Sequence, residues 1–369
     1  MDYPEAQKST SFNEHVSRIW NKISAPISAL SLALIFSAIA ILLLGKNPVE
    51  AFKSIIVGGF GSRYSITEVL VKSSPLILAA LGTAIAFRCK MWNIGVEGQL
   101  LIGGAAASAV VLAFPGLPGF VLVPLAILAS FLAGGFWAGI AGYLKARYKA
   151  SEIINTIMLN YVAIYLVELL VRGPLKDPTG FVPQSARFVP QAWLPILVQN
   201  TRLHAGFVFA LIALLAGSFF LTKTTLGFSI IAVGSNPKAA EASGISIYHH
   251  MIVAMFISGG LAGLAGAGEV LGLHHKLLSG FSAGYGFSAM AAAILGGLNP
   301  LGVGIFSFLF AALRVGADHM QRQMAVPIAL VYLIEGTVII FLQAREMLPN
   351  ALSQLRKKAV NIWQNEKVG

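Results

Sequence analysis

The chain has little cysteine and little charge. Cys89 is the only cysteine among 369 residues, which excludes an intrachain disulfide and a metal site built on cysteines. The paired histidines His249–His250 and His274–His275 bracket one apolar run and would lie about 37 Å apart along a straight helix, so we expect no metal site. Charged residues make up 11%, where soluble proteins have roughly a quarter. This balance argues against a soluble globular fold.

The sequence also lacks the motifs of several enzyme classes. It contains no glycine-rich loop that ends in Gly-Lys-Ser or Gly-Lys-Thr and could hold phosphates. It contains no His-Glu-x-x-His pattern and no recognisable nucleophile–base motif. We therefore expect neither ATP hydrolysis nor other catalysis on this chain.

Apolar residues, by contrast, make up 56% of the chain and form runs of membrane-spanning length from Ile23 to Gln343. The sequence predicts an all-α polytopic membrane protein with about ten transmembrane helices. The clearest runs are Ser28–Leu44, Val121–Tyr143, Ile153–Val171, Phe207–Leu221, Met251–Leu273 and Ile328–Leu342. Shorter or glycine-interrupted runs are Ile66–Phe87, Gly95–Phe114, Gly286–Gly297 and Gly302–Val315.

The basic residues indicate the orientation. Arg18 and Lys22 precede the first run, and short basic loops are retained on the cytoplasmic side. With ten spans, both termini are cytoplasmic. This gives an N-terminal tail over 1–24, a transmembrane domain over 25–343 and a basic C-terminal tail over 344–369. The formal charge of +11 is scattered among loops, which fits an anionic inner leaflet better than nucleic acid.

Two glycine- and alanine-rich segments occupy matching places in the two halves of the chain, at 93–106 and 284–297. Short, glycine-interrupted spans in corresponding positions indicate an inverted repeat with the transport pathway between the halves. We therefore predict a five-plus-five arrangement. The alternative is that small residues, such as Gly135 with Gly139 and Gly259 with Gly263, only let helices approach closely.

Glu97 is the strongest candidate among the ionisable groups inside the apolar runs, where charges are costly. Asn93 lies four residues earlier on the same helical face, and Gln99 adds a third polar group. A hydrated pathway would satisfy all three side chains. Equally, the stretch could cap the start of a helix, where a carboxylate suits the helix dipole.

Asn155 and Asn160 are a second polar set on the fifth span, and we assign them to the pathway as well. The alternative is that they form hydrogen bonds between helices. For the remaining carboxylates in or near the spans we expect structural roles. These are Glu168, Glu269 and Glu335.

The inward loop over 223–249 carries helix punctuation. Asn236 can cap a helix, Pro237 suits its first turn, and Gly244 can end it. We predict a short helix that offers a rigid surface to a cytoplasmic partner, against the alternative of an ordinary connector. The outward loop over 172–204 contains five prolines, which limit helix formation, and Trp193, which suits the membrane interface.

These motifs together resemble the permeases of bacterial ATP-binding cassette importers, in the group that transports ribose, branched-chain amino acids and nucleosides. The resemblance covers about residues 66 to 343 and is strongest at Met91–Gln99, Ala232–Ala240 and Gly284–Phe287. Sugar permeases of this group usually have an Asp-Leu-Ser type signature where this chain has Asn93–Glu97, which favours the nucleoside branch.

The resemblance implies a set of functional residues. The pathway residues would be Asn93, Glu97, Gln99, Asn155, Asn160, Tyr285 and Phe287. The loop that couples to the ATPase would use Ala232, Gly234, Asn236, Pro237, Ala239, Ala240 and Gly244.

It also implies an assembly in the bacterial inner membrane. The partners would be a separate ATPase that binds ATP and magnesium, a sister permease in a heterodimer, and an extracytoplasmic binding protein. The substrates would be nucleosides or related small polar solutes. The competing hypothesis is a stand-alone, proton-coupled secondary carrier, which would also show inverted repeats and buried carboxylates.

Overall fold

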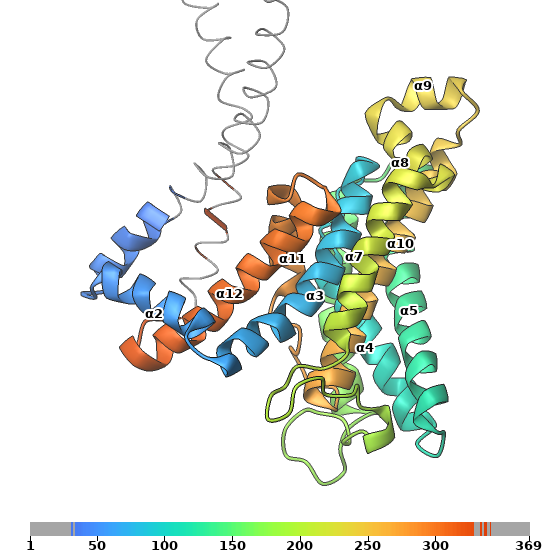
Figure 1. Ribbon diagram of the computed structural model, residues 1–369. Helices are drawn as coiled ribbons and strands as arrows, with labels where there is room; N and C mark the ends of the chain where they lie inside the picture. Colours follow the sequence, from blue (N-terminus) through green and yellow to red (C-terminus); the bar gives the residue numbers. More distant parts are fainter. Residues whose placement is uncertain (1–30, 32–33, 328–332, 334–335, 338–339, 341–369) are drawn as a thin grey trace, which may run out of the picture. The chain divides into compact units, whose positions relative to one another are not determined.

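The described part of the chain is helical, as the sequence predicts. The computed structural model describes residues 31, 34–327, 333, 336–337 and 340. Over these residues there is no strand, and the only β-type pairing consists of isolated bridges in loops (Figure 1). The helices are α2 (Pro48–Phe60), α3 (Arg63–Arg88), α4 (Val96–Ala113), α5 (Gly119–Tyr148), α6 (Glu152–Arg172), η1 (Pro190–Ala192), α7 (Gly206–Lys223), α8 (Thr225–Ser235), α9 (Pro237–Ala242), α10 (Ile247–Gly268), η2 (Glu269–His274), α11 (Tyr285–Leu295) and α12 (Pro300–Met324).

The chain divides into two compact units. One unit comprises residues 1–52 and 321–369, and its described part includes a helical stretch at Leu34–Leu43. The other unit is Lys53–Met320 and contains α3 to α11 in full. All the residues of the candidate site lie in this second unit.

Seven helices of the described chain are long and apolar enough to cross a membrane, and the bent pair Leu34–Leu43 with Pro48–Phe60 could form an eighth. Two further apolar helices, α8 and α11, have only 11 residues each, about half of what a full span needs. The predicted span at Ile328–Leu342 lies almost entirely outside the described residues. The described residues therefore contain seven or eight candidate spans, and the count of ten remains a prediction.

Small residues bring α10 against α5, as the close-approach alternative proposed for Gly259 and Gly263. A Cβ atom at Gly259 would lie 2.2 Å from the carbonyl oxygen of Gly134, and one at Gly263 would lie 2.3 Å from a carbonyl oxygen of α5. Gly135 likewise faces an aromatic ring of α10. The expectation is wrong for Gly139, because a Cβ atom there would meet nothing within 4 Å. Gly139 therefore brings α5 closer to no described helix, which sequence spacing alone did not reveal.

The loop between α6 and α7 is attached to the end of α10 by backbone hydrogen bonds. The amides of Ser185, Phe188 and Leu194 donate to carbonyl oxygens of residues 277, 275 and 271, at 2.9, 2.8 and 3.1 Å. Trp193 stacks on the His275 ring with centroids 4.1 Å apart. As the prolines predict, the loop contains little helix, only the three residues of η1. It is nevertheless an ordered layer over the end of the helical bundle.

Candidate functional site

Glu97 lies in the first turn of α4 and is buried, with 6% of its surface exposed. Its carboxylate accepts hydrogen bonds from the Ser282 hydroxyl, from the Gly284 amide at 3.1 Å and from the Gly286 amide at 2.7 Å. Gly284 is the N-cap of α11, so two of the free amides at that helix start point at the carboxylate. A negative charge at a helix N-terminus is electrostatically favourable.

Arg314 approaches the same turn from α12 and is also buried, with 5% of its surface exposed. Its guanidinium donates to the carbonyl oxygens of Ala283 and Gly284, at 3.1 and 3.3 Å, and to the Ser288 hydroxyl at 2.6 Å. The guanidinium carbon lies 4.8 Å from the centre of the Tyr285 ring, a cation–π distance. Two buried charges of opposite sign therefore contact the same stretch of backbone.

We call residues 282–288 the α11 entry turn. Gly284 is bonded on both sides, with its amide on Glu97 and its carbonyl oxygen on Arg314. Its φ of 76° lies in the left-handed region that favours glycine. A Cβ atom at Gly286 would lie 2.3 Å from the Glu97 backbone nitrogen. Glycine at 286 is what allows the starts of α4 and α11 to touch.

Near the contact between the starts of α4 and α11, Asn93 and Gln99 form hydrogen bonds with each other and not with Glu97. Two hydrogen bonds of 2.8 and 2.9 Å join their side chains, and Asn93 also donates to the Ser258 hydroxyl on α10 at 2.9 Å. Both side chains are buried. Glu97 lies in the first turn of α4, where the capping alternative places it, and the backbone amides that its carboxylate caps are those of α11.

The other predicted pathway residues differ in environment. Asn160 accepts from the Gly98 amide at 2.8 Å and donates to the Ile94 carbonyl oxygen at 2.9 Å, so it bonds α6 to the start of α4. The Asn155 Nδ2 atom is buried without a hydrogen-bond partner among the described residues. Tyr285 is buried under Arg314, whereas Phe287 is half exposed. Their role in transport stays a prediction.

Several charged groups in the spans were not singled out from the sequence. Arg314 is the most important. Lys72 of α3 forms an ion pair with Asp318 of α12, and Glu68 of α3 forms one with Arg202 of the α6–α7 loop. A charge within an apolar run is itself the signal that could have identified Arg314, Lys72 and Glu68. Ser282 and Ser288 carry no such signal, because serine is common in membrane helices.

Two of the other carboxylates have local partners. Glu168 pairs with Arg172 one turn later at 2.7 Å, on an exposed part of α6. Glu269 is buried, with an oxygen 3.5 Å from the His274 Nε2 atom. Glu335 lies outside the described residues. No group of three metal-ligating side chains occurs within the described ranges.

The predicted short helix within the loop over 223–249 is confirmed as α9. The Asn236 side chain accepts from the Ala239 amide at 3.2 Å, Pro237 occupies the first turn, and Gly244 follows with φ 82°. Asn236, Pro237 and Ala239 are exposed, whereas Ala240 is buried. Ala232 lies on the preceding helix α8 and is partly exposed.

Gly234 has a packing role that the sequence did not reveal. It lies against the turn after α3, where a Cβ atom would be 1.9 Å from the Arg88 carbonyl oxygen. The Arg88 side chain donates to the Leu298 carbonyl oxygen at 3.1 Å, between α11 and α12. From Arg88 the chain needs only residues 89–95 to reach the start of α4. Residues 89–95 thus connect the turn against which Gly234 packs to the start of α4, where Glu97 lies.

His204 is a buried titratable group at the opposite end of the bundle, just before α7. Its Nδ1 atom accepts from the Gly206 amide at 3.1 Å, which places the proton of the neutral ring on Nε2. Burial, together with the nearby charge of His275, lowers the pKa of His204 to about 4. The ring therefore stays neutral at physiological pH.

Comparison with known proteins supplies the context of this geometry. Residues 65–343 match the family described as branched-chain amino acid transport system / permease component. The chain is 37% identical over 337 residues to the glucose ABC transporter permease protein TsgB13 of Haloferax volcanii, an alignment that covers 89% of this chain and 88% of that protein. It is 36% identical over 340 residues to the guanosine ABC transporter permease protein NupP of Bacillus subtilis, covering 91% and 97%.

A third relative is the nucleoside ABC transporter permease protein NupB of Lactococcus lactis, with 34% identity over 344 residues, 89% of this chain and 94% of that protein. Lactococcus and Bacillus each hold a second permease of the same designation that is 28% identical to this chain. No solved structure matches the chain. With its apolar spanning helices and a family match over most of its length, the chain belongs to the branched-chain amino acid transport permease family and is a multi-pass transport subunit of the ATP-binding cassette class, not itself an enzyme.

Proposed function

We propose that this chain forms the translocation pathway for nucleosides or related small polar solutes in an importer of the bacterial inner membrane. The observation that carries the proposal is identity of 34–37% over about nine-tenths of the chain to permeases whose designations are nucleoside, guanosine and glucose. The lining of this pathway consists of Asn93, Glu97, Gln99, Asn155, Asn160 and Tyr285, which carry polar groups, and of the aromatic ring of Phe287. Two of the three designations favour a nucleoside over a sugar.

Energy for transport comes from a separate ATPase, which binds ATP and magnesium, and this chain needs no cofactor. The family match favours this mechanism over a proton-coupled carrier, because members are permease components of multi-subunit systems. The loop over 223–249 docks on the ATPase through α9, which has a capped start and an exposed surface. Movement of α9 reaches the pathway through the contact between Gly234 and Arg88 and through residues 89–95.

The full permease domain spans residues 25–343 and contains ten helices in a five-plus-five inverted repeat, with both termini cytoplasmic. The contact between the starts of α4 and α11 supports the repeat, because these are the two segments that match in sequence. In this arrangement the α11 entry turn lies between the halves. A change in the relative position of α4 and α12 would move it.

Two further partners complete the assembly. A sister permease forms a heterodimer with this chain, as the paired permeases of Lactococcus and Bacillus suggest. An extracytoplasmic binding protein docks on the loop over 172–204. The backbone bonds of that loop to residues 271–277 would carry docking forces to α10.

Uptake by the reconstituted complex tests the proposal. The chain is co-expressed with its proposed partner subunits, purified in mild detergent and placed in vesicles that contain ATP inside. We expect ATP-dependent uptake of radiolabelled guanosine or adenosine, with glucose as the comparison solute. Uptake that persists without ATP and follows an imposed proton gradient would instead establish the carrier.

A further inference from the structure

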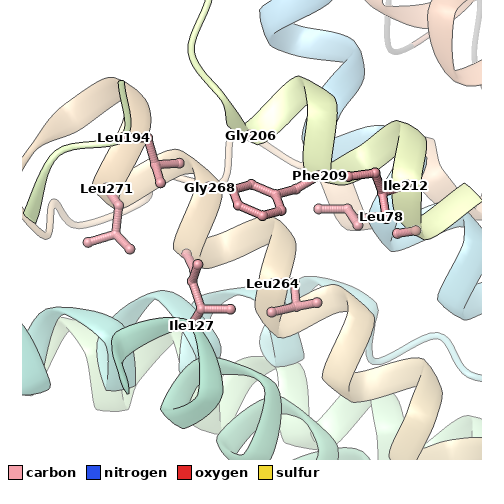
Figure 2. Close-up of a pocket in the computed structure, with 11 residues that line it drawn as sticks. Leu78, Ile127, Leu194, Gly206, Phe209, Ile212, Leu264, Gly268 and Leu271 are labelled. Atoms are coloured by element: carbon pink, nitrogen blue, oxygen red, sulfur yellow. The ribbon is translucent and has the colours of Figure 1, made fainter. Parts of the chain in front are cut away.

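An apolar cavity of about 160 Å³ lies in the helical bundle near the loop between α6 and α7. Side chains from α3, α5, α7, α10 and that loop surround it (Figure 2). All eleven lining residues are apolar or glycine. They are Leu78, Ile127, Leu194, Gly206, Phe209, Ile212, Ala213, Leu264, Ala267, Gly268 and Leu271. None of these lining residues is Glu97, belongs to the α11 entry turn or lies in the loop over 223–249.

The cavity is deep on one side and open on the other. Leu78, Leu194 and Leu271 form a buried wall, with at most 5% of each residue exposed. Phe209 and Ile212 form the rim on α7, with 49% and 56% exposed. The neighbouring outward faces of α7 and α5 are apolar and exposed, as lipid-facing surfaces are. The opening therefore faces sideways, toward the hydrocarbon of the bilayer.

Water does not fill a space of this chemistry. An apolar cavity of about 150 Å³ in a soluble protein stays dry and binds benzene. In a bilayer the available apolar molecule is a lipid tail. The space is too narrow for a helix and suits an unbranched chain.

The depth of the cavity and the nearby charge indicate which molecule supplies the tail. Leu194 in the wall follows Trp193, and tryptophan is enriched at the level of the lipid headgroups. The exposed Arg187 guanidinium lies 5.0 Å from the centre of the Trp193 ring. The cation on Trp193 is thus carried by the same loop that supplies Leu194 to the cavity wall, one residue after the tryptophan. This combination matches a phosphate above an acyl chain.

We infer that this cavity holds the end of a phospholipid acyl chain from the leaflet that meets the α6–α7 loop, with the phosphate toward Arg187. The tail would support Leu194, Leu271 and the π-helical turn η2 from inside. It would thereby stabilise the contact between the loop and the end of α10. The inference stands independently of the proposed substrate, since it concerns the lipid-facing side of the chain.

Gly268 makes the inference testable. A Cβ atom there would meet nothing within 4 Å, and its backbone is α-helical with φ −56°, so a larger side chain fits without strain. Gly268→Leu fills the cavity from α10, and Ala213→Leu fills it from α7. Gly139→Leu is the matched control, because Gly139 also has open space around it but lies away from the cavity.

The experiment places the full chain with its partner subunits in phosphatidylglycerol vesicles that contain a phosphatidylglycerol with a diazirine at the end of one tail. After illumination, the labelled peptides are mapped by mass spectrometry. We expect a peak of labelling within residues 206–213 and 264–271. Gly268→Leu should reduce this peak about tenfold, because excluding two methylenes from an apolar site costs roughly that factor in affinity. Gly139→Leu should leave it unchanged.

Ala213→Leu should reduce labelling in the same way, which covers the case that Gly268→Leu alters folding. Arg187→Gln should reduce labelling by the anionic lipid more than labelling by a zwitterionic lipid with the same tail. Labelling spread evenly over all exposed apolar helices would overturn the inference. So would preferential labelling by a diazirine fatty acid without a headgroup, or a cross-link showing that a side chain of the sister permease fills the cavity.

Discussion

Replacing Glu97 with glutamine removes a buried charge while keeping the shape of the side chain. Glu97 accepts three hydrogen bonds from the α11 entry turn, on both carboxylate oxygens. A glutamine can keep the bonds of one oxygen, but its amide group then faces the Gly286 amide, donor against donor. An unsatisfied buried amide costs about 1–3 kcal/mol, and the change from charged to neutral acceptor costs about 1 kcal/mol more. We expect Glu97→Gln to reduce the free energy of unfolding by about 2–4 kcal/mol.

Arg314→Gln should show energetic coupling to Glu97→Gln. Gly284 donates to one charged group and accepts from the other, so loosening the turn on one side weakens the bonds on the other. We expect the double variant to lose less stability than the sum of the single losses, by about 0.5–3 kcal/mol. Glu168 and Arg172 form the matched control pair, because they are exposed and one turn apart, and such pairs contribute about 0.3–0.5 kcal/mol.

The assay is equilibrium unfolding of the detergent-solubilised chain, followed by far-ultraviolet circular dichroism across a denaturant titration. Guanosine uptake by the reconstituted complex is measured in parallel for each variant. Additive effects of Glu97→Gln and Arg314→Gln, within about 0.3–0.5 kcal/mol, would refute the shared turn. A stable Glu97→Gln variant with altered substrate affinity would instead favour direct contact of Glu97 with the solute.

Three further predictions concern Gly286, the α9 loop and His204. Gly286→Ala should destabilise the chain by about 1–3 kcal/mol, because the new Cβ atom would lie 2.3 Å from the Glu97 backbone nitrogen. A thermal unfolding midpoint equal to that of the unchanged chain would contradict this close contact. Ala239→Glu, at an exposed site on α9, should abolish ATP-driven uptake and leave thermal stability unchanged. Gly234→Leu should abolish uptake and also lower thermal stability, because Gly234 packs against the Arg88 carbonyl oxygen. Full uptake by Ala239→Glu would reject the docking role of α9. His204 has a pKa of about 4 in the folded chain, below its unfolded value of 6.5. Its contribution to the free energy of unfolding, about 2–4 kcal/mol, is therefore fully present above pH 6.5 and is lost as the pH falls toward 4. His204→Gln should flatten that part of the measured stability–pH curve.

Local signals in the sequence predicted local structure well. The α9 helix is the clearest case, because Asn236, Pro237 and Gly244 act on residues within one or two turns of themselves. Capping depends on backbone geometry over four or five residues, and the sequence contains that information directly. The apolar runs predicted membrane helices for the same reason. Run length is a property of contiguous residues.

The partners of the buried polar groups could not be predicted in this way. Glu97 and Ser282 are 185 residues apart, and nothing near either one indicates the other. Arg314 carried a signal as a charge in an apolar run, but its target on the α11 entry turn depends on how α12 packs. Gly139 and Gly134 look alike in sequence, yet only Gly134 faces α10. A rotation of α5 about its axis, which packing sets, distinguishes them.

The sequence by itself determined that this is an all-helical membrane protein, where its apolar segments lie, and that a capped helix follows Asn236. Each of these depends on interactions between residues close in the chain. The tertiary structure decided that the starts of α4 and α11 meet, that Glu97 and Arg314 hold one turn between them, and that Gly234 packs against the turn after α3. These contacts join segments far apart in sequence. They exist only because burying a charge or a backbone amide in an apolar bundle requires a partner, and packing determines which partner is within reach.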